Sequence, residues 1–308
     1  MKVNIPQGKY ILAVSGGVDS MVLLDLLVKQ AKSQELKAKS SGIELSARDL
    51  QLVVAHFDHG IRNDSDEDEK LVRVTAKKYG LSFEVGHGHL GPSASEDAAR
   101  KARYQFLEAV RQQHKAKAII TAHHQDDLIE TALLNIIRGT KRKGLSAIAS
   151  NIRIIRPLLK IAKKEVLNYA HEHKLKWRED PSNLDTKILR NYLRLRIIPK
   201  MTVHQRGKIL KNIDNVAKIN IVVDSQIATL SQLIVKDGRI ERSKFALLPT
   251  EVTQELVVYW LRQHGIAQID SHSVSRVAVF IKTGKPGTTA SVKGTSKIKL
   301  EKDYAGFA

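Results

Sequence analysis

The sequence Ser15-Gly16-Gly17-Val18-Asp19-Ser20 follows a short apolar run at 10–14 and leads into an apolar-faced segment at 20–34. The run at 10–14 predicts a buried strand, and the segment after the glycines predicts a helix. A glycine turn between a strand and a helix directs free backbone N–H groups and the positive end of the helix at an anion. Paired glycines let the backbone approach phosphate oxygens, and serine hydroxyls add donors. The sequence therefore predicts a phosphate-binding loop at 15–20.

An acidic residue distinguishes this loop from a Walker A motif, in which a lysine follows the glycines. Here Asp19 stands in the place of that lysine. A carboxylate beside a polyphosphate repels it unless a cation intervenes, so Asp19 predicts a Mg²⁺ site. A serine-capped turn is the alternative for two glycines alone. The complete hexapeptide resembles the SGGxDS loop of the PP-loop ATP pyrophosphatases, which cleave ATP between its α and β phosphates. That resemblance implies ATP binding by Ser15, Gly16, Gly17, Val18, Asp19 and Ser20.

Apolar runs and helix-like segments alternate through the first part of the chain. Strands are expected at 10–14, 51–57, 82–85 and 117–122, and helices at 20–34, 66–79, 95–114 and 126–137. This alternation predicts an α/β fold, a doubly wound, Rossmann-like parallel sheet that binds its ligand at the carboxyl ends of the strands. Further on, helices are expected at 209–234, 249–264 and 271–281, and a hairpin from 288–292 and 297–300. We expect a catalytic domain at 1–200, and a helical connector with a small, mainly helical and basic domain at 201–308.

Composition excludes several classes of protein. The chain has 308 residues, of which 42% are hydrophobic and 27% are charged, and it contains no cysteine. Disulfides, cysteine-ligated zinc, iron–sulfur clusters and thiol chemistry on this chain are thereby excluded. No apolar run reaches the ~20 residues that span a bilayer, and the first residues lack an apolar signal core. We therefore expect a cytoplasmic protein without a membrane partner.

The net charge of +19 is distributed unevenly along the chain. Residues 1–137 contain 18 basic and 18 acidic residues, residues 138–200 contain 17 and 5, and residues 201–308 contain 16 and 9. The excess of positive charge therefore lies beyond residue 137, whereas charge that serves solubility alone would be spread along the chain. A polyanion accounts for this asymmetry. Nucleic acid is favoured over a membrane surface because no basic amphipathic helix with an aromatic face stands out.

Polar residues end the second expected strand, at the sheet edge where nucleotides bind. His56, Asp58 and His59 are expected there as nucleotide-binding residues, with a solvated loop as the alternative for any one of them. On the third expected helix, Arg100 and Arg103 share a face and are suited to bidentate binding of phosphate or carboxylate. A solvent-exposed helix face is the alternative for these two arginines.

Acids and histidines gather after the fourth expected strand, in the sequence Thr121-Ala122-His123-His124-Gln125-Asp126-Asp127-Leu128-Ile129-Glu130-Thr131. Asp127 and Glu130 are three residues apart, so they share a helix face. Each acid alone would serve the dipole of a helix start. Three acids and two histidines exceed that need, and they suit Mg²⁺ or the ammonium group of an amino substrate. His123 and Asp126 are therefore candidate substrate ligands.

Basic residues beyond this acidic cluster suit a nucleic-acid backbone. Several lie in a glycine-bracketed loop at 139–144, and others lie in a basic helix that follows a turn at 180–183. A solvated surface is the alternative for both segments. The candidate polyanion ligands are Arg138, Lys141, Arg142, Lys143, Arg153, Arg156, Arg190 and Arg194.

Seven motifs in order form a specific set: SGGVDS, HFDHGIR, ARKARY, TAHHQDDLIET, IRGT…GL, RPLL and DPSN…RNYLR. Together they resemble the tRNA(Ile)-lysidine synthetases over about residues 10–198. The resemblance implies that ATP adenylates the C2 oxygen of the wobble cytidine (position 34) in tRNA(Ile) with a CAU anticodon. The ε-amine of free L-lysine then attacks C2, which expels AMP and leaves lysidine. Whether the chain forms a homodimer is left open.

The same resemblance implies a role for each group of residues. The loop at 15–20 cradles the departing pyrophosphate, and its aspartate holds Mg²⁺. Arg100 and Arg103 neutralise phosphate charge. Asp127 and Glu130 bind lysine, and one of these two acids accepts a proton from its ammonium group. The target base is unstacked into the pocket. The catalytic set implied is Asp19, Arg100, Arg103, Asp127 and Glu130.

Three alternatives stay open at this point. A tRNA thiolase shares the fold, but it needs cysteines or a cluster, and this chain has no cysteine. A synthetase that adds ammonia or an amide has no use for a basic C-terminal half. A noncatalytic RNA-binding protein would release no pyrophosphate when tRNA and lysine are supplied.

Overall fold

A computed structural model describes residues 1–40, 50–61, 64–91, 94–140, 142–146, 148, 153–266, 269–293 and 296–308. The chain divides into two compact units, Met1–Asp214 and Asn215–Ala308. The division falls within one long helix, α8 (Val203–Ile234), whereas the sequence placed a domain boundary at residue 200.

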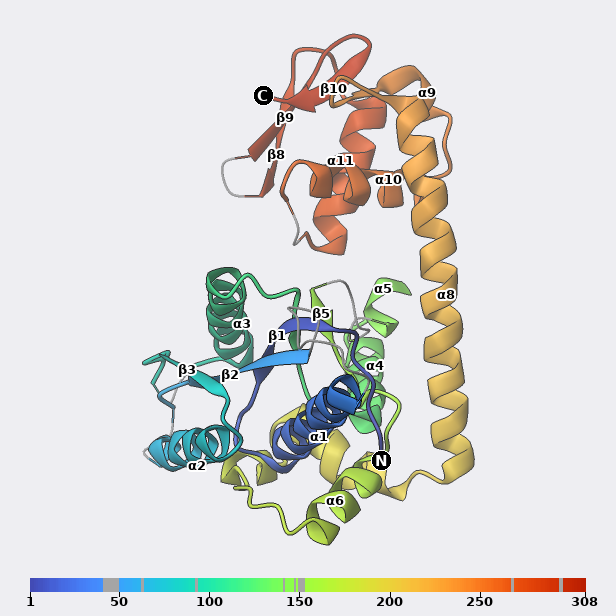
Figure 1. Ribbon diagram of the computed structural model, residues 1–308. Coiled ribbons are helices and arrows are strands. Elements are labelled where there is room, and N and C mark those ends of the chain that lie inside the picture. Colours follow the sequence, from blue (N-terminus) through green and yellow to red (C-terminus); the bar gives the residue numbers. More distant parts are fainter. Residues whose placement is uncertain are drawn as a thin grey trace. The chain divides into compact units, whose positions relative to one another are not determined.

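The first unit is built on a five-stranded parallel sheet in the order β3-β2-β1-β4-β5 (Figure 1). Its strands are β1 (Gly8–Ala13), β2 (Leu50–Asp58), β3 (Ser82–His87), β4 (Ala118–Ile120) and β5 (Ile154–Ile155). The order reverses at β1, so the carboxyl ends of β1 and β4 flank the point where such sheets bind ligands. The predicted doubly wound α/β fold is confirmed.

Helices connect these strands and cover both faces of the sheet (Figure 1). The longer ones are α1 (Val18–Ser40), α2 (Ser65–Lys78), α3 (Glu96–Gln113), α4 (Gln125–Ile137) and α6 (Lys163–Glu172). Short ones are α5 (Arg142–Leu145), α7 (Leu189–Tyr192), the 3-10 helices η1 (Pro181–Leu184) and η3 (Ile198–Lys200), and the π-helix η2 (Leu193–Ile197). The four helices and four strands expected before residue 138 are all present.

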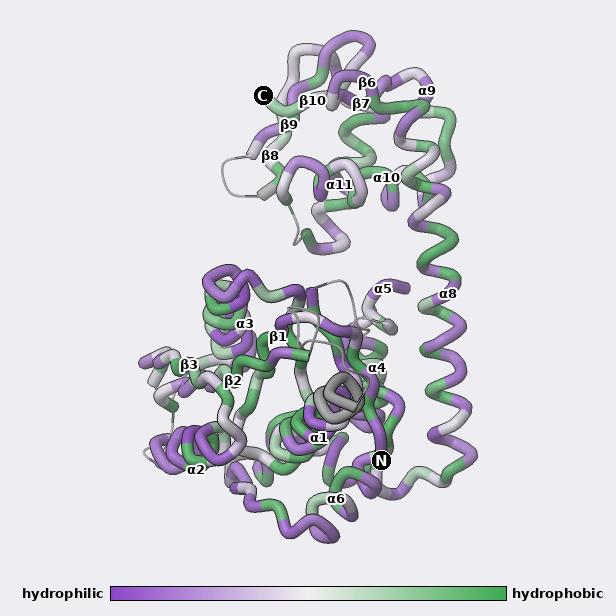
Figure 2. The backbone as a smooth tube through the Cα atoms, viewed as in Figure 1, coloured by the Kyte–Doolittle hydropathy of each residue, from purple (hydrophilic) through white to green (hydrophobic). Residues whose placement is uncertain are grey.

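Alternating side chains of β1 place one core on each face of the sheet. Tyr10 and Leu12 belong to the larger core, with residues of α1, α2 and α6. Ile11 belongs to the smaller core, where Leu107 and Val110 of α3 pack against the sheet. In Figure 2, β2 is mostly hydrophobic and α2 mostly hydrophilic, as expected for a buried strand and a helix with one buried face.

The second unit combines helices with a second, antiparallel sheet in the order β6-β7-β10-β9-β8. The strands are β6 (Val235–Lys236), β7 (Arg239–Glu241), β8 (Thr289–Lys293), β9 (Ser296–Leu300) and β10 (Tyr304–Phe307). The helices after α8 are α9 (Arg242–Ala246), α10 (Thr250–Gln263) and α11 (Ser271–Thr283). Fully buried Trp260 and Phe245 belong to their common core. The expected helices and the β8–β9 hairpin are present, and three further short strands extend that hairpin.

Among the helices that the structure describes, none combines the length and hydropathy needed to cross a membrane.

Candidate active site

The serines of the loop between β1 and α1 form hydrogen bonds within the loop. The Ser20 hydroxyl donates to the carbonyl oxygen of Gly17 at 2.8 Å and accepts from the backbone N–H of Ser15 at 3.2 Å. Gly16 has a φ of +90°, a left-handed conformation that side chains disfavour. His56, at the end of β2, donates from Nδ1 to the carbonyl oxygen of Val14 at 2.8 Å. The loop therefore has the strand–turn–helix geometry of an anion site, and His56 holds the backbone of Val14, the residue that precedes the loop.

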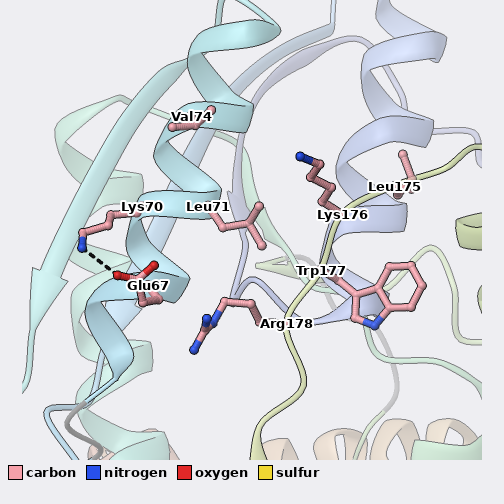
Figure 3. Close-up of a pocket in the computed structure, with 8 residues that line it drawn as sticks. All are labelled: Glu67, Lys70, Leu71, Val74, Leu175, Lys176, Trp177 and Arg178. Atoms are coloured by element: carbon pink, nitrogen blue, oxygen red, sulfur yellow. Dashed lines mark hydrogen bonds and ion pairs between the residues drawn. The ribbon is translucent and has the colours of Figure 1, made fainter.

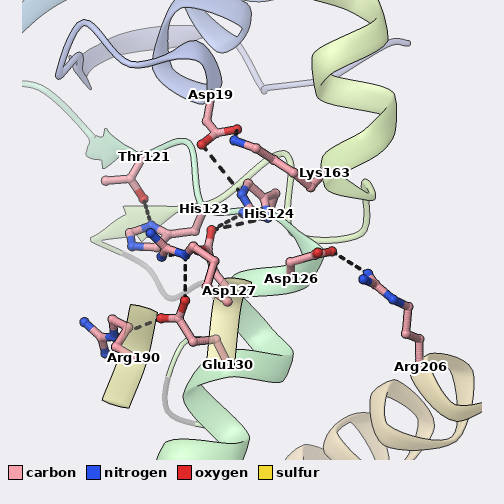
Figure 4. A network of polar contacts seen from close by, with 11 residues as sticks. Asp19, Thr121, His123, His124, Asp126, Asp127, Glu130, Lys163, Arg190 and Arg206 are labelled. Atoms are coloured by element: carbon pink, nitrogen blue, oxygen red, sulfur yellow. Dashed lines mark hydrogen bonds and ion pairs between the residues drawn. The ribbon is translucent and has the colours of Figure 1, made fainter. Parts of the chain in front are cut away.

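Asp19, in the first turn of α1, contacts two basic side chains (Figure 4). Its Oδ1 accepts from Lys163 Nζ at 2.5 Å, and its Oδ2 lies 3.6 Å from Nε2 of His124. Burial of Asp19 opposes ionisation, but His124 and Lys163 outweigh it and lower the pKa of Asp19 to about 2. Burial opposes protonation of His124, but its contacts with Asp19 and Asp127 outweigh burial and raise the pKa of His124. Asp19 is therefore a carboxylate in a cationic setting.

The acids of α4 are paired with arginines from the segment after η1 (Figure 4). Glu130 Oε2 accepts from Arg194 Nε at 2.8 Å, and Glu130 Oε1 lies 2.8 Å from Arg190 Nε. Arg194 also reaches Asp127 at 3.4 Å, so Asp127 and Glu130 share a face as their spacing predicts. Arg190 further pairs with Glu96 of α3. We expected these two arginines to contact a polyanion, whereas here they neutralise carboxylates.

Glu130 is almost fully buried, with 3% of its surface exposed. Burial raises the pKa of Glu130 to about 7, against the lowering effect of Arg194. Asp126 points elsewhere and accepts from Arg206 of α8 at 2.9 Å. Within the acidic cluster, Asp127 and Glu130 therefore share an arginine partner, whereas Asp126 has a different one.

His123 lies in a group of arginines on the other side of the α4 start. Its Nδ1 hydrogen-bonds to Thr121 Oγ1 at 2.8 Å. Burial, together with the positive charges of Arg156, Arg103 and Arg100, lowers the pKa of His123 to about 3. His123 is thus a neutral imidazole at physiological pH, and its surroundings favour an anion.

Arg100 and Arg103 both stack on Tyr104, with guanidinium carbons 4.9 and 5.3 Å from the ring centre. Neither forms an ion pair with a carboxylate among the described residues, and Nε of Arg103 is buried without a hydrogen-bond partner. Burial lowers the pKa of Arg103. A partly desolvated guanidinium with no carboxylate partner is suited to binding an anionic ligand.

At the end of β2, Asp58 and His59 have different surroundings. Asp58 accepts from the backbone N–H of Gly60 at 2.8 Å and from the Ser65 hydroxyl at 3.0 Å, so it holds the turn before α2. Burial and the charge of Arg103 lower the pKa of His59, and its Nδ1 is buried without a partner. His59 therefore faces the arginine group, while Asp58 is used within its own loop.

A groove of about 600 Å³ lies beside the phosphate loop, between α2 and the segment 175–178 (Figure 3). Leu71, Val74 and Trp177 supply apolar lining. Arg178 lines the groove too, and its backbone N–H donates to the carbonyl oxygen of Gly16 at 3.1 Å. Its guanidinium donates to Asp64 and Asp68 at 2.9 and 2.8 Å. Arg178 therefore ties the loop to the start of α2.

The basic residues expected to contact a polyanion lie in several elements. Arg142 and Lys143 lie on α5, Arg138 directly follows the last residue of α4, and Lys141 lies outside the described residues. Arg156 corrects the expectation, because it is 6% exposed and lies beside His123. A buried arginine at this place belongs to the site and not to an outer phosphate-binding surface.

Four site residues were not identified from the sequence as active-site candidates: Thr121, Lys163, Arg178 and Arg206. Thr121 lies in a motif that the sequence had singled out, so its proximity to His123 was available. The contacts of Lys163, Arg178 and Arg206 join segments 144, 110 and 80 residues apart. No local pattern indicates such pairings.

A family model and individual relatives that match this chain indicate the same family. A family model described as a PP-loop domain matches residues 2–201, more than half of the chain. A tRNA(Ile)-lysidine synthase of Gloeobacter violaceus is 31% identical over 271 residues, which cover 83% of this chain and 78% of that protein.

Other relatives are longer than the matched region. The tRNA(Ile)-lysidine synthase of Lactiplantibacillus plantarum is 32% identical over 277 residues, covering 85% of this chain and 58% of that protein. That of Thermus thermophilus is 38% identical over 205 residues, covering 63% of this chain and 36% of that protein. The chain thus spans about a third to three fifths of the length of these two curated relatives. With the phosphate loop, the α4 acids and these matches together, the chain belongs to the PP-loop family and, within it, to the tRNA(Ile)-lysidine synthases.

Proposed function

We propose that this chain ligates L-lysine to C2 of the wobble cytidine (position 34) of tRNA(Ile) with a CAU anticodon, through an adenylated tRNA, and releases AMP and pyrophosphate. One observation carries the proposal: Nε2 of His124 lies 3.6 Å from Oδ2 of Asp19, and Nδ1 of His124 lies 3.5 Å from Oδ2 of Asp127. It thereby joins the phosphate loop to the acid pair of α4. A nucleotide held by the loop and an ammonium group held by the acids would meet at one sheet edge.

For the adenylation step, the loop at 15–20 would bind the phosphates that leave. Arg100 and Arg103, which lack carboxylate partners among the described residues, would neutralise charge as the α–β bond breaks. Mg²⁺ in nucleotide sites uses one or two carboxylates together with phosphate oxygens and water, so the single carboxylate of Asp19 fits it. Bound Mg²⁺ would supply charge neutralisation at the phosphates.

For the ligation step, Asp127 and Glu130 would bind the ε-ammonium of lysine. A nucleophilic amine must first lose a proton, and a base works best when its pKa is near the working pH. Burial raises the pKa of Glu130 to about 7, which suits that role better than an ordinary carboxylate. In the structure Arg190 and Arg194 form ion pairs with these acids, so binding of lysine would have to replace part of this pairing.

The positive charge beyond residue 137 supports tRNA as the polyanion. A cytidine in an anticodon loop can be unstacked into a pocket at small cost, because it is not paired in a duplex. ATP, Mg²⁺, free L-lysine and tRNA(Ile) are therefore the ligands we propose.

Incubation with α-labelled ATP, lysine and a CAU-anticodon tRNA(Ile) tests this function. We expect labelled AMP and, after digestion, a nucleoside heavier than cytidine by lysine minus water. The matched control is the same tRNA with uridine at position 34, which should give no such product. ADP as the main labelled product, or an unchanged cytidine with no pyrophosphate release, would contradict the proposal and favour another class of RNA-binding protein.

The basic segment at 139–144, expected as a loop but containing the start of helix α5, gives a second prediction, about tRNA affinity. Changing Lys141, Arg142 and Lys143 to glutamate should weaken binding of many tRNAs alike and leave the choice of base unchanged, because phosphate contacts position and base contacts specify. The log–log salt slope of affinity should flatten by about 0.7–0.9 for each phosphate that the variant no longer neutralises. Fluorescence anisotropy at several salt concentrations measures both quantities.

A matched triple reversal on the charge-neutral part of the chain, at exposed Lys77, Lys78 and Lys101, serves as the control. It changes the net charge equally but should leave the salt slope near that of the unaltered protein. Equal effects of the two triple variants on the salt slope would show that the basic segment at 139–144 does not contact tRNA phosphates.

A further inference from the structure

The phosphate loop contains no lysine of its own, and its aspartate would repel a polyphosphate. In a Walker A motif a lysine within the loop reaches the β and γ phosphates. In this chain, the ammonium group of a lysine from an element distant in the sequence lies beside the loop at 15–20. Lys163 Nζ lies 2.5 Å from Asp19 Oδ1, although 144 residues separate the two.

The backbone position of Lys163 is fixed by the packing of α6 against α1. Lys163 is the first residue of α6. Further along the same helix, Tyr169 donates from its hydroxyl to Asp25 of α1 at 2.7 Å, and Lys29 pairs with the same carboxylate at 2.9 Å. Val166 of α6 is fully buried in the core that α1 shares. The start of α6 is therefore held beside the phosphate loop.

Both members of the Lys163–Asp19 pair can be reached by a ligand. The Lys163 side chain is 32% exposed and that of Asp19 is 30% exposed. An ammonium group carries three donors on a flexible stem, so Lys163 can contact a new acceptor by a change of side-chain rotamer alone. His124 remains at the other oxygen of Asp19.

We propose that Lys163 is the phosphate-binding lysine of this loop, held on Asp19 until a polyphosphate arrives and then paired with the β and γ phosphates. This inference rests on the proposed function, because it concerns the same nucleotide site. When the bond between the α-phosphorus and the bridging oxygen breaks, that oxygen keeps the electron pair and leaves as part of pyrophosphate. The cytidine oxygen forms the new bond to the α-phosphorus. Lys163 transfers no proton in this step and contributes positive charge beside the leaving group.

Titration calorimetry of the full chain with inorganic pyrophosphate, without divalent metal, tests the role directly. Loss of one charge-assisted hydrogen bond predicts that Lys163→Met binds pyrophosphate about 10- to 100-fold more weakly. Lys163→Arg should retain most of the affinity. Lys164→Met, one residue along and exposed, is the matched control and should bind as the unaltered chain does. Unchanged affinity in Lys163→Met would overturn the inference.

Removal of Lys163 also leaves Asp19 without one of its two basic partners, so a second comparison separates the two effects. In the Asp19→Asn background no carboxylate repels the ligand, and this variant should bind metal-free pyrophosphate more tightly than the unaltered chain. Adding Lys163→Met to it should weaken binding at least about tenfold. Equal affinities of Asp19→Asn and the double variant would show that Lys163 only neutralises Asp19.

The outcome is distinguishable from failure of the proposed function. If the unaltered chain makes no lysidine but Lys163 governs pyrophosphate affinity, the function is wrong and the residue assignment stands. If lysidine forms and Lys163→Met binds pyrophosphate with unchanged affinity, only the assignment of Lys163 as the phosphate-binding lysine is wrong. Thermal unfolding of each variant shows whether it is folded at the temperature of the titration.

Discussion

Replacing Asp19 by asparagine is expected to lower AMP formation by about 10³-fold, the effect typical of losing a main electrostatic contact to a transition state. The amide has nearly the same shape but no charge, so it would no longer hold Mg²⁺ against the phosphates. In the structure this carboxylate is ionised at all working pH values, because His124 and Lys163 overcome its burial and lower the pKa of Asp19 to about 2. Release of labelled AMP under saturating ATP, lysine and tRNA measures the loss.

Binding of tRNA by the same variant should stay within about twofold of the unaltered protein, because the positive charge that attracts it lies beyond residue 137. The control is Asp66→Asn, which makes the same change in charge at an exposed residue in the first turn of α2. It should retain full activity. If Asp19→Asn lost tRNA affinity in parallel with activity, the phosphate loop itself would be part of the tRNA surface.

The phosphate loop could be predicted from sequence because all of its determinants are local. A buried strand, two glycines, two serines and a helix start follow one another within about a dozen residues, and each imposes its geometry on the next. The acid pair on α4 was predictable for the same reason, since a spacing of three residues fixes a common face.

Contacts between distant segments could not be predicted in this way. Arg190 and Arg194 lie in a basic segment, which indicated a polyanion partner, yet both side chains turn toward the buried Glu130. The sequence supplies the residue type but not the direction in which the fold presents it. Lys163 carries no local signal at all, because its partner is 144 residues away.

Very short strands escaped prediction for a different reason. β5, β6 and β7 contain two or three residues each, too few to show an alternating pattern of apolar and polar side chains. They form because a neighbouring strand offers its free edge, as β4 does for β5 and β10 does for β7. That edge exists only after the rest of the sheet has folded.

Replacing Glu130 by glutamine, or Asp127 by asparagine, should raise the KM for lysine by about 100-fold or more, as loss of a desolvated charge partner does elsewhere. The KM for ATP should change little. The two acids face Arg190 and Arg194, and removing one negative charge leaves these guanidinium groups to repel the incoming ammonium. Steady-state kinetics with each substrate varied in turn separate the two KM values. Glu172→Gln, at an exposed residue ending α6, is the control with an equal change in charge.

The pH dependence of lysine use gives the same prediction a second test. The pKa of Glu130 is raised above that of ordinary glutamate, to about 7, so its carboxyl is neutral below that pH and ionised above it. Only the ionised form attracts an ammonium group or accepts its proton. The kcat/KM for lysine should therefore rise as the pH increases through about 7, and Glu130→Gln should lose this rise. A rise that persists in Glu130→Gln would assign the titration to another group.

An equal increase in the KM for ATP and the KM for lysine would instead indicate that Asp127 and Glu130 hold the metal ion. A metal ion that neutralises the nucleotide phosphates would serve both substrates alike.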